Sequence, residues 1–455
     1  MPRPPSAGSA DPQSDRAAPD MRATAREVFL QALAETSIPK AFERNVSYSR
    51  GVLQVCDDLY DLGAYDRVFV LALGKAAHTM LQALAGQVGP GLSGIVAAPT
   101  EPESQLSGFR YYRGGHPLPN AESLRAGDAV LKALHGLTSN SLALYLISGG
   151  GSAVIEKPID PEITLDDVIA TYQALVLSGA PIAEINVIRK HLSALKGGRM
   201  TLAATLAQHL SIMVSDVPDA ALDSLASGPT MPDPSTVEDC YTIAQRHKLL
   251  PALPASVREL FEQHALEETP KADEAAFVRS RWWPLLSNAT AQKAAAAQAT
   301  AHGFAVEVDN SCDDWDYRKA ADHLLKKLRK LRAGVSRVCL ISGGEVTVKV
   351  EAQGSKGKLG VGGRNQQFAL HCAEHIAGEN ITVLSAGTDG IDGNSPAAGA
   401  IADGSTTARA QAAGFDPANS LAAFDAFPFF EALGDTIVTG PTGNNVRDLR
   451  ILLAH

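Results

Sequence analysis

The stretch RVFVLALGKAAHTMLQALAG, residues 67–86, shows the pattern on which the fold depends. The apolar run Val68–Leu73 is typical of a short buried strand, and the residues after Gly74 and Lys75 are typical of a helix. The same order of apolar strand, Gly-rich or polar turn and helix recurs at LALYLISGGGSA, SIMVSDVPDAALDS, RVCLISGGE and TVLSAGTDGIDG. This alternation predicts an α/β protein with largely parallel strands, whose following loops gather at one edge of the sheet.

The length of the chain sets the expected number of domains. At 455 residues it is longer than a single hydrophobic core usually organises, so we expect two α/β domains with the active site in a cleft between them. The first spans 23–285 and the second spans 286–455. Apolar spacing is mostly helical from residue 23 up to the first strand, and the part from Pro232 to about Trp283 is a helical connection.

Composition excludes several classes of protein. The formal net charge of -10 argues against a general nucleic-acid binder, which presents a basic face to phosphates. No window approaches the roughly 20 unbroken apolar residues of a membrane helix. The five cysteines include no Cys-x-x-Cys pair and are odd in number, which indicates reduced thiols and a cytoplasmic protein. Residues 1–22 lack the apolar core of a secretory signal, so we expect a disordered leader.

The first candidate site is Gly74 and Lys75, where the strand turns into a helix. A helix N-terminus offers unpaired N–H groups and partial positive charge, Gly lets the backbone approach a phosphate, and Lys75 adds a full cation. Together they predict a binding site for an anion. The alternative is a solvent-exposed Lys after an ordinary turn.

The second candidate site is the loop Ser148-Gly149-Gly150-Gly151-Ser152, again after an apolar strand. Three successive glycines permit a concave arrangement of backbone N–H groups, and the serines add hydroxyl donors. This combination is suited to nucleotide phosphates, whereas a merely flexible turn would need fewer glycines.

The third candidate lies in the stretch 186–199, which ends in Lys196, Gly197, Gly198 and Arg199. If the stretch is one helix, then Asn186, Ser193 and Lys196 lie with the intervening basic residues on one cationic face that stops at Gly197. Lys196 and Gly197 are therefore candidates for contact with a nucleotide. A solvated basic face is the commoner explanation of such a pattern.

Acidic side chains follow two of the predicted strands. Asp216 comes after an apolar run, and Asp389 lies in the loop Gly387–Gly393. Carboxylates at strand ends can hold Mg²⁺ or accept the proton of an attacking hydroxyl, so both residues are candidates for catalysis and for metal binding. Ordinary Asp-Gly turn chemistry is the alternative, and it explains Asp392-Gly393 well.

The last candidates surround a second Gly-rich loop. Gly343, Gly344 and Glu345 follow a strand, and the glycines between 354 and 363 predict a flexible, closing loop. Arg364 then begins a helix, where its fork of N–H donors could reach a phosphoryl group or a carboxylate. We include Asn365 beside it as a candidate for nucleotide contact.

Motif scans exclude two other kinds of site. The chain has no Gly-x-x-x-x-Gly-Lys-Ser/Thr sequence, so a P-loop is unsupported. A G-x-G-x-x-G pattern occurs at Gly89, Gly91 and Gly94, but it follows a predicted helix and precedes a strand. A dinucleotide-binding fingerprint needs the reverse order, so this pattern gives no support for NAD binding. Spacing suited to a structural zinc site is also absent.

Taken in order, these segments resemble the class II glycerate 2-kinase family, whose C-terminal half is called the MOFRL domain. The resemblance extends from about Val68 to Leu449 and is carried by ALGKAA, GGHPLPNAES, SGGGSA, INVIRKHLSALKGGRM, SDVPDAALDSLASGPT, LISGGEVTV, GGRNQQFAL, SAGTDGIDGNSPAAGA and TGPTGNNVRDL. It implies a Rossmann-like first domain and a MOFRL second domain. Residues 440–448 are candidates for packing back on the first domain.

The resemblance also implies an activity. Members transfer the γ-phosphoryl group of ATP to D-glycerate, with Mg²⁺ or another divalent cation, to give 2-phosphoglycerate, and their catalytic lysine and arginine match Lys75 and Arg364. A homodimer is compatible with the sequence. Two alternatives stay open: a hydroxypyruvate reductase, which is a name that relatives have carried, and a nucleotide-binding regulator without catalysis.

Overall fold

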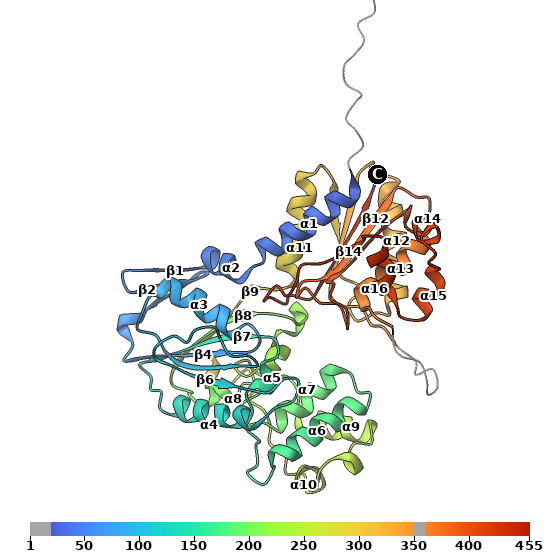
Figure 1. Ribbon diagram of the computed structural model, residues 1–455. Coiled ribbons are helices and arrows are strands. Elements are labelled where there is room, and N and C mark those ends of the chain that lie inside the picture. Colours follow the sequence, from blue (N-terminus) through green and yellow to red (C-terminus); the bar gives the residue numbers. More distant parts are fainter. Residues whose placement is uncertain (1–19, 350–359) are drawn as a thin grey trace, which may run out of the picture.

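The computed structural model describes residues 20–349 and 360–455, which form two lobes (Figure 1). The first lobe contains a six-stranded sheet in the order β6-β5-β4-β7-β8-β9, and every neighbouring pair is parallel. Its strands are β4 (Arg67–Leu73), β5 (Ser93–Ala98), β6 (Phe109–Arg113), β7 (Ser141–Ser148), β8 (Gln208–Val214) and β9 (Ser280–Leu286). The predicted α/β class with a mostly parallel first sheet is confirmed.

The order of these strands determines where a ligand can bind. The chain starts in the middle of the sheet at β4, moves outward through β5 to β6, and then returns to the other side of β4 with β7. This is the strand order of a Rossmann fold, whose ligands bind where the direction of winding reverses. The loops after β4 and β7, with Lys75 and the three glycines, lie at this position.

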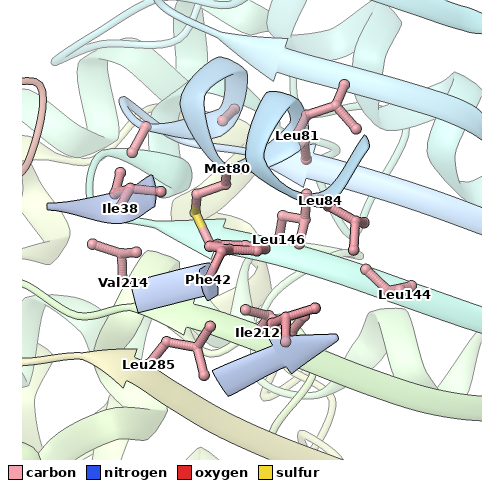
Figure 2. Close-up of a cluster of buried hydrophobic side chains, with 14 of the residues drawn as sticks. Ile38, Phe42, Met80, Leu81, Leu84, Leu144, Leu146, Ile212, Val214 and Leu285 are labelled. Carbon is pink, nitrogen blue, oxygen red and sulfur yellow. The ribbon is translucent and has the colours of Figure 1, made fainter. Parts of the chain in front are cut away.

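One face of the first sheet is covered by α2 (Ile38–Asn45) and α3 (Ala77–Val88). Figure 2 shows Phe42 and Met80 from these helices against Leu146 and Ile212 of the sheet, and all four side chains are buried. Burial of one such side chain stabilises the fold by about 1.5–3 kcal/mol. The strands are apolar on both faces because α4 (Ala121–His135) covers the opposite face.

A helical unit lies between β7 and β9. It contains α6 (Leu165–Leu177), α7 (Ile182–His191), α9 (Val237–Arg246) and α10 (Ala255–Glu262), which share a small core of their own. Shorter turns of helix complete it: α5 (Gly151–Val154), α8 (Arg199–Leu202), η2 (Asp219–Ser227), η3 (Leu250–Ala252) and η4 (Ala275–Phe277). The predicted helical connection after Pro232 is wrong at its end, because residues from Ser280 form the edge strand β9.

The second lobe contains a mixed sheet in the order β10-β11-β15-β12-β13-β14. Only β10 and β11 run parallel among these neighbours, and the other pairs are antiparallel. Its strands are β10 (Ala305–Val308), β11 (Val338–Gly343), β12 (Ile381–Gly387), β13 (Gly399–Asp403), β14 (Thr436–Ile437) and β15 (Asp448–Ala454). Its helices are α11 (Asn288–Ala301), α12 (Tyr317–Arg332), α13 (Arg364–His375), α14 (Thr406–Ala412), α15 (Pro417–Ala422) and α16 (Ala426–Ala432).

The helix α1 (Met21–Glu35) does not belong to the lobe in which the sequence places it. Its Val28 and Phe29 are fully buried in a cluster with Leu384 and Ile451 of the second sheet. The prediction that residues from 23 onward form the first domain is therefore wrong for this helix (Figure 1). The reason is that an amphipathic helix shows that it has an apolar face but not which sheet the face covers.

Two further expectations for the N-terminal part need correction. The predicted leader 1–22 extends too far, because α1 begins at Met21 with Asp20 as its N-cap, while residues 1–19 lie outside the described residues. The expected helical stretch before the first strand contains an antiparallel sheet of β1 (Val46–Ser49), β2 (Val52–Val55) and β3 (Asp58–Asp61), and then the short turn η1 (Leu62–Ala64).

Residues 354–359 of the predicted closing loop also lie outside the described residues. Among the helices of the described ranges, none has the length and apolar character needed to cross a membrane.

Candidate active site

The loop after β4 is locked against the loop after β7. Gly74 adopts φ +105°, and its N–H donates to the carbonyl oxygen of Ala97 at 3.1 Å. The next N–H, of Lys75, donates to the carbonyl oxygen of Gly149 at 2.9 Å, and the N–H of Ala76 donates to the Ser148 hydroxyl at 3.0 Å. A Cβ atom at Gly74 would lie 2.4 Å from the Ser148 carbonyl oxygen, so only glycine allows this contact. The side chain of Lys75 is left exposed.

The three glycines after β7 each make close contact with a neighbour. A Cβ atom at Gly149 would lie 1.8 Å from a carboxylate oxygen of Asp216, and one at Gly150 would lie 3.1 Å from both Lys75 Cγ and the His116 ring. The N–H groups of Gly150 and Gly151 donate no hydrogen bond within 20–349 and 360–455. These glycines therefore bring a carboxylate and an ammonium group beside unpaired backbone donors.

The hydroxyl of Ser148 has a different role from the predicted one. It accepts from Ala76 and donates to the carbonyl oxygen of Leu73 at 3.2 Å, so both of its hydrogen bonds hold the two loops together. Ser152, at the other end of the loop, forms a 2.7 Å hydrogen bond with Ser227.

A pocket of about 220 Å³ joins the two lobes at this point. Five of the predicted site residues line it, namely Lys75, Ser148, Gly149, Asp216 and Asp389. The rest of the lining comes from Ala76, Val214, Ile391, Gly443, Asn444 and Asn445. Residues 443–445 thus line the same pocket as residues of the first lobe. The amide of Asn444 also donates to the carbonyl oxygen of Thr36, the C-cap of α1, at 2.6 Å.

The two carboxylates of the pocket come from opposite lobes. Asp216 follows β8, and burial raises the pKa of this carboxyl although the positive charges of Lys75 and Arg447 oppose the shift. Asp389 follows β12, and its carboxylate accepts the N–H of Ile391 at 3.1 Å. The lining of the pocket therefore combines one ammonium group with two acidic groups.

Arg364 begins α13 and is held by two acidic residues of the second lobe. Its Nε lies 2.6 Å from one carboxylate oxygen of Asp448, its Nη2 lies 3.0 Å from the other, and Nη2 lies 2.9 Å from Glu345. Burial lowers the pKa of Arg364, but the two carboxylates outweigh it and raise the pKa overall. Since Asp448 is only 1% exposed, its bidentate contact fixes the direction of the guanidinium.

Arg364 does not line the 220 Å³ pocket but lies next to it. Glu345, which pairs with Arg364, links this arginine to the pocket. The pKa of Glu345 is raised by burial, by the charge of Asp448 and, more weakly, by the charge of Asp216 of the opposite lobe. A charge on Asp216 is therefore close enough to act on the partner of Arg364.

The structure does not bring Gly343 and Gly344, predicted as nucleotide contacts, to the pocket of Lys75. Their N–H groups already donate to Asn310 and Asn288, both at 3.0 Å, and their carbonyl oxygens accept from the buried Arg450. A Cβ atom at Gly343 would lie 1.7 Å from the Asn288 side chain. These glycines serve close packing inside the second lobe, while the next residue, Glu345, pairs with Arg364.

Lys196 and Gly197, two further predicted nucleotide contacts, do not line this pocket either. The helix α7 ends at His191, so the supposed cationic face does not continue to Lys196. The Lys196 ammonium is 2% exposed and donates to Glu156 and to the hydroxyl of Tyr172. The N–H of Gly197 donates to the carbonyl oxygen of Ser227 at 3.0 Å.

Asn365 does not face a ligand, and Asp392 has a larger role than that of a turn residue. The carboxylate of Asp392 accepts the N–H groups of Asn365 at 3.1 Å and Gln366 at 2.9 Å, so it caps the helix that begins with Arg364. Asn365 is 1% exposed, and its side chain accepts from the hydroxyl of Ser385. Asn365, predicted as a nucleotide contact, is therefore not among the residues that line the pocket.

Sequence reasoning missed two residues beside the pocket. Arg447 adopts φ +70° and forms a bidentate pair with Asp313 at 2.6 and 2.7 Å. His116 packs against Gly150, and burial together with the positive charge of Lys75 lowers its pKa. Both belong to segments that carry the resemblance, TGPTGNNVRDL and GGHPLPNAES, and this is the signal that could have identified them.

A separate group of metal-binding type lies at the other end of α13. Asp322, His371 and His375 place their ligand atoms within 4.8 Å of one another. Imidazole is not a preferred ligand of Mg²⁺, which binds carboxylate and other oxygen atoms. Within the described ranges, Asp216 and Asp389 are the predicted metal ligands that share a pocket with Lys75.

The environment of Asp392 predicts a pH-dependent contribution to stability. Burial raises its pKa to about 6, although N–H bonds from Gln366 and Asn365 favour the charged form. The folded state thus binds this proton more tightly than the unfolded chain, whose Asp has a pKa of about 3.9. Below about pH 4 the protonated carboxyl contributes up to about 3 kcal/mol to the free energy of unfolding. This contribution is lost as the pH rises through about 6.

Chemical denaturation between pH 4 and 7 tests this expectation. The free energy of unfolding of the wild type should fall, relative to that of Asp392→Asn, as the pH rises over this range. The variant removes this one titration and leaves the other carboxyl groups as an internal control. A constant difference between the two proteins over the whole range would contradict the raised pKa.

Comparisons with known proteins identify the family of the chain. A family model described as a domain of unknown function (DUF4147) matches residues 24–262, and the model of the MOFRL family matches residues 338–448. The chain is 35% identical over 396 residues to the D-glycerate 2-kinase of Thermotoga maritima, covering 85% of this chain and 90% of that protein. A putative hydroxypyruvate reductase of Agrobacterium vitis is 36% identical over 393 residues, covering 85% of this chain and 87% of that protein.

A solved structure extends the comparison to the fold. The crystal structure of glycerate kinase from Thermotoga maritima matches with a TM-score of 0.80 and 32% identity, covering 96% of this chain and 99% of that one. Both domains, their order and the arrangement of the two sheets are therefore shared over nearly the whole length. The family resemblance seen in the sequence is confirmed, and the chain belongs to the glycerate kinase family with a MOFRL domain.

Proposed function

We propose that this protein transfers the γ-phosphoryl group of ATP to D-glycerate and so forms 2-phosphoglycerate. The observation that carries the proposal is the pocket between the lobes, where Lys75 lies with Asp216 and Asp389 beside the Gly-rich loop at the reversal point of the first sheet. Relatives named D-glycerate 2-kinase and glycerate kinase support the choice of substrate.

The first lobe supplies the groups that would bind phosphate. Lys75 has an exposed ammonium group beside the unpaired N–H donors of Gly150 and Gly151. Backbone donors at a Gly-rich turn and one full cation are suited to the β- and γ-phosphates of a nucleotide. Gly74, Ser148 and Gly149 support this arrangement by holding the two loops in contact.

The second lobe supplies Arg364, which would stabilise the charge that develops on the transferred group. Its guanidinium remains 37% exposed although Asp448 and Glu345 hold it in place. A donor fixed in this way loses little freedom when it meets a phosphoryl group. In the reaction, the bond from the γ-phosphorus to the bridging oxygen breaks, the acceptor oxygen bonds to that phosphorus, and the hydroxyl proton passes to a carboxylate.

The donor set of the pocket fits a divalent cation. Asp216 and Asp389 offer carboxylate oxygens, which are the ligands that Mg²⁺ prefers, and the two residues would hold the ion from opposite lobes. Bound there, Mg²⁺ would neutralise phosphate charge and help to align the nucleotide. Asp216 also suits proton acceptance, because burial raises its pKa.

Substitution of each carboxylate separates these roles. Asp216→Asn and Asp389→Asn should weaken binding of Mn²⁺, used as a paramagnetic probe in the presence of ATP, by at least about tenfold. Asp128→Asn, an exposed aspartate on α4, serves as the control. If Asp216→Asn binds Mn²⁺ normally but has a low kcat, Asp216 is the proton acceptor; unchanged Mn²⁺ binding in both variants would remove the metal site from this pocket.

The alternative activity is that of a hydroxypyruvate reductase, which one relative carries in its name. A reductase needs a nicotinamide site, but Gly89, Gly91 and Gly94 run from the end of α3 into β5 and so have the wrong order for a dinucleotide loop. The retained Lys75 and Arg364 likewise argue against a regulator without catalysis. The free thiols of all five cysteines support a cytoplasmic location.

One assay distinguishes these activities. The protein, ATP, Mg²⁺ and D-glycerate should give 2-phosphoglycerate, identified by phosphorus NMR, and hydroxypyruvate with NADH should show no oxidation. Product at the 3-position would refute the 2-kinase assignment. NADH oxidation at a rate that matches glycerate turnover would favour the reductase, and no product from either mixture would favour the regulator.

Two substitutions test the charge donors. Lys75→Ala and Arg364→Ala should each lower kcat by at least about a hundredfold, as expected for the loss of a group that stabilises transition-state charge. Lys132→Ala and Arg110→Ala, at exposed positions of the first lobe, should stay near the wild-type rate.

The Arg364 variant needs a second measurement, because it leaves the buried carboxylate of Asp448 unpaired. Thermal unfolding of Arg364→Ala shows whether the variant has a folding defect. Arg364→Lys keeps the charge but loses the fork of N–H donors, so its turnover shows whether the defect is catalytic. Near-normal turnover in a folded Lys75 or Arg364 variant would refute the role of that residue.

A further inference from the structure

Arg189 on α7 has no counter-ion among the residues that the structure describes. Its guanidinium lies 4.3 Å from the ring centroid of Tyr172, and its Nε is buried without a hydrogen-bond partner. Within residues 20–349 and 360–455 it forms no ion pair. The other two cations of this stretch are both neutralised, Lys190 by Asp223 and Asp233, and Lys196 by Glu156.

The position of Arg189 connects it to the Gly-rich loop of the candidate active site. Asn186 lies one turn earlier on α7 and accepts from the Ser227 hydroxyl at 3.4 Å. Ser227 in turn contacts the hydroxyl of Ser152 at 2.7 Å, and Ser152 ends the loop whose Gly150 touches Lys75. Both α5 and α7 pack against η2, which contains Ser227, and they lie close together in Figure 1.

The charges around Arg189 favour an anion. The nearby carboxylate of Glu156 already accepts hydrogen bonds from Lys196 and from the hydroxyls of Tyr172 and Ser193. It is therefore engaged by other groups and does not pair with Arg189. The fork of N–H donors of a guanidinium fits a planar anion with two oxygen atoms best. A carboxylate has this shape.

We propose that Arg189 binds the carboxylate of the small hydroxy-acid acceptor, with the hydroxyls of Ser152 and Ser227 beside it. This inference rests on the proposed function and identifies the group that would recognise the acid. Lys75 and the N–H donors of the Gly-rich loop then serve the nucleotide, and Arg189 serves the acceptor on the α7 side of the same loop.

Steady-state kinetics of Arg189→Ala and Arg189→Lys test the proposal. Loss of a charge-assisted hydrogen-bond donor should raise the KM for D-glycerate at least about tenfold, because the acid loses its fork of donors. The KM for ATP should stay within about twofold of the wild type. Added guanidinium ion should restore part of the activity of Arg189→Ala but not that of the wild type.

A matched control distinguishes ligand binding from packing. Arg337 also stacks on an aromatic ring, 4.5 Å from the centroid of Phe304, and also has a buried, unpaired Nε, but it precedes β11 in the second lobe. Arg337→Ala should leave the KM for D-glycerate unchanged. If Arg337→Ala raises this KM as much as Arg189→Ala does, the effect reflects lost packing and the proposal fails.

Other outcomes overturn the proposal directly. A KM for D-glycerate within threefold of the wild type in both Arg189 variants would refute it, and a rise in the KM for ATP alone would assign Arg189 to the nucleotide. If the wild type phosphorylates no glycerate, the proposed function fails first. Saturation-transfer NMR of D-glycerate with the wild type and Arg189→Ala then decides separately whether Arg189 binds the acid.

Discussion

The contact between Gly74 and Ser148 is the constraint on which the pocket depends. It joins the loops after β4 and β7, where the winding of the first sheet reverses, and leaves no room for a side chain at Gly74. The same contact directs the Lys75 side chain away from the strands, because the backbone of Lys75 is bonded to Gly149. Backbone packing thus fixes the position of the loops that carry the groups proposed to bind phosphate.

In the second lobe, ion pairs hold the site residues in place, whereas in the first lobe close backbone contacts do so. Asp448 holds Arg364, Asp313 holds Arg447, and both arginines belong to segments that face the first lobe. Each pair restricts a long, flexible side chain to one direction before any ligand binds. A site divided in this way can change its opening by movement between lobes while each half keeps its own geometry.

The sequence predicts the elements of the site better than it predicts their partners. The strands before Lys75, Asp216 and Asp389 have a local signal, an apolar run followed by a polar or Gly turn, and these three residues do line one pocket. The partner of Lys196 has no such signal, because Glu156 lies 40 residues earlier and meets it only in the folded chain.

The same limit explains the other misses. A Gly-rich turn after β11 looks like a phosphate loop in the sequence, but Asn288 and Asn310 from distant segments already occupy its N–H groups. Conversely, Asp392 fits a turn by local rules, whereas its cap on the helix of Arg364 depends on a contact 26 or 27 residues away. Local patterns identify where a loop lies, and tertiary contacts decide which of its donors are free.

The packing of α1 on the second lobe has a consequence for biosynthesis. Val28 and Phe29 pack on a sheet whose central strand, β15, ends at Ala454, so their apolar face has no complete partner until that strand has left the ribosome. At a synthesis rate of roughly 5–20 residues per second, the time between the synthesis of α1 and that of β15 is roughly 20 to 85 seconds. During this time the first lobe can already fold around β4 to β9. The nascent chain therefore carries a helix whose apolar face is covered only in part, by α11, until the last strand is made.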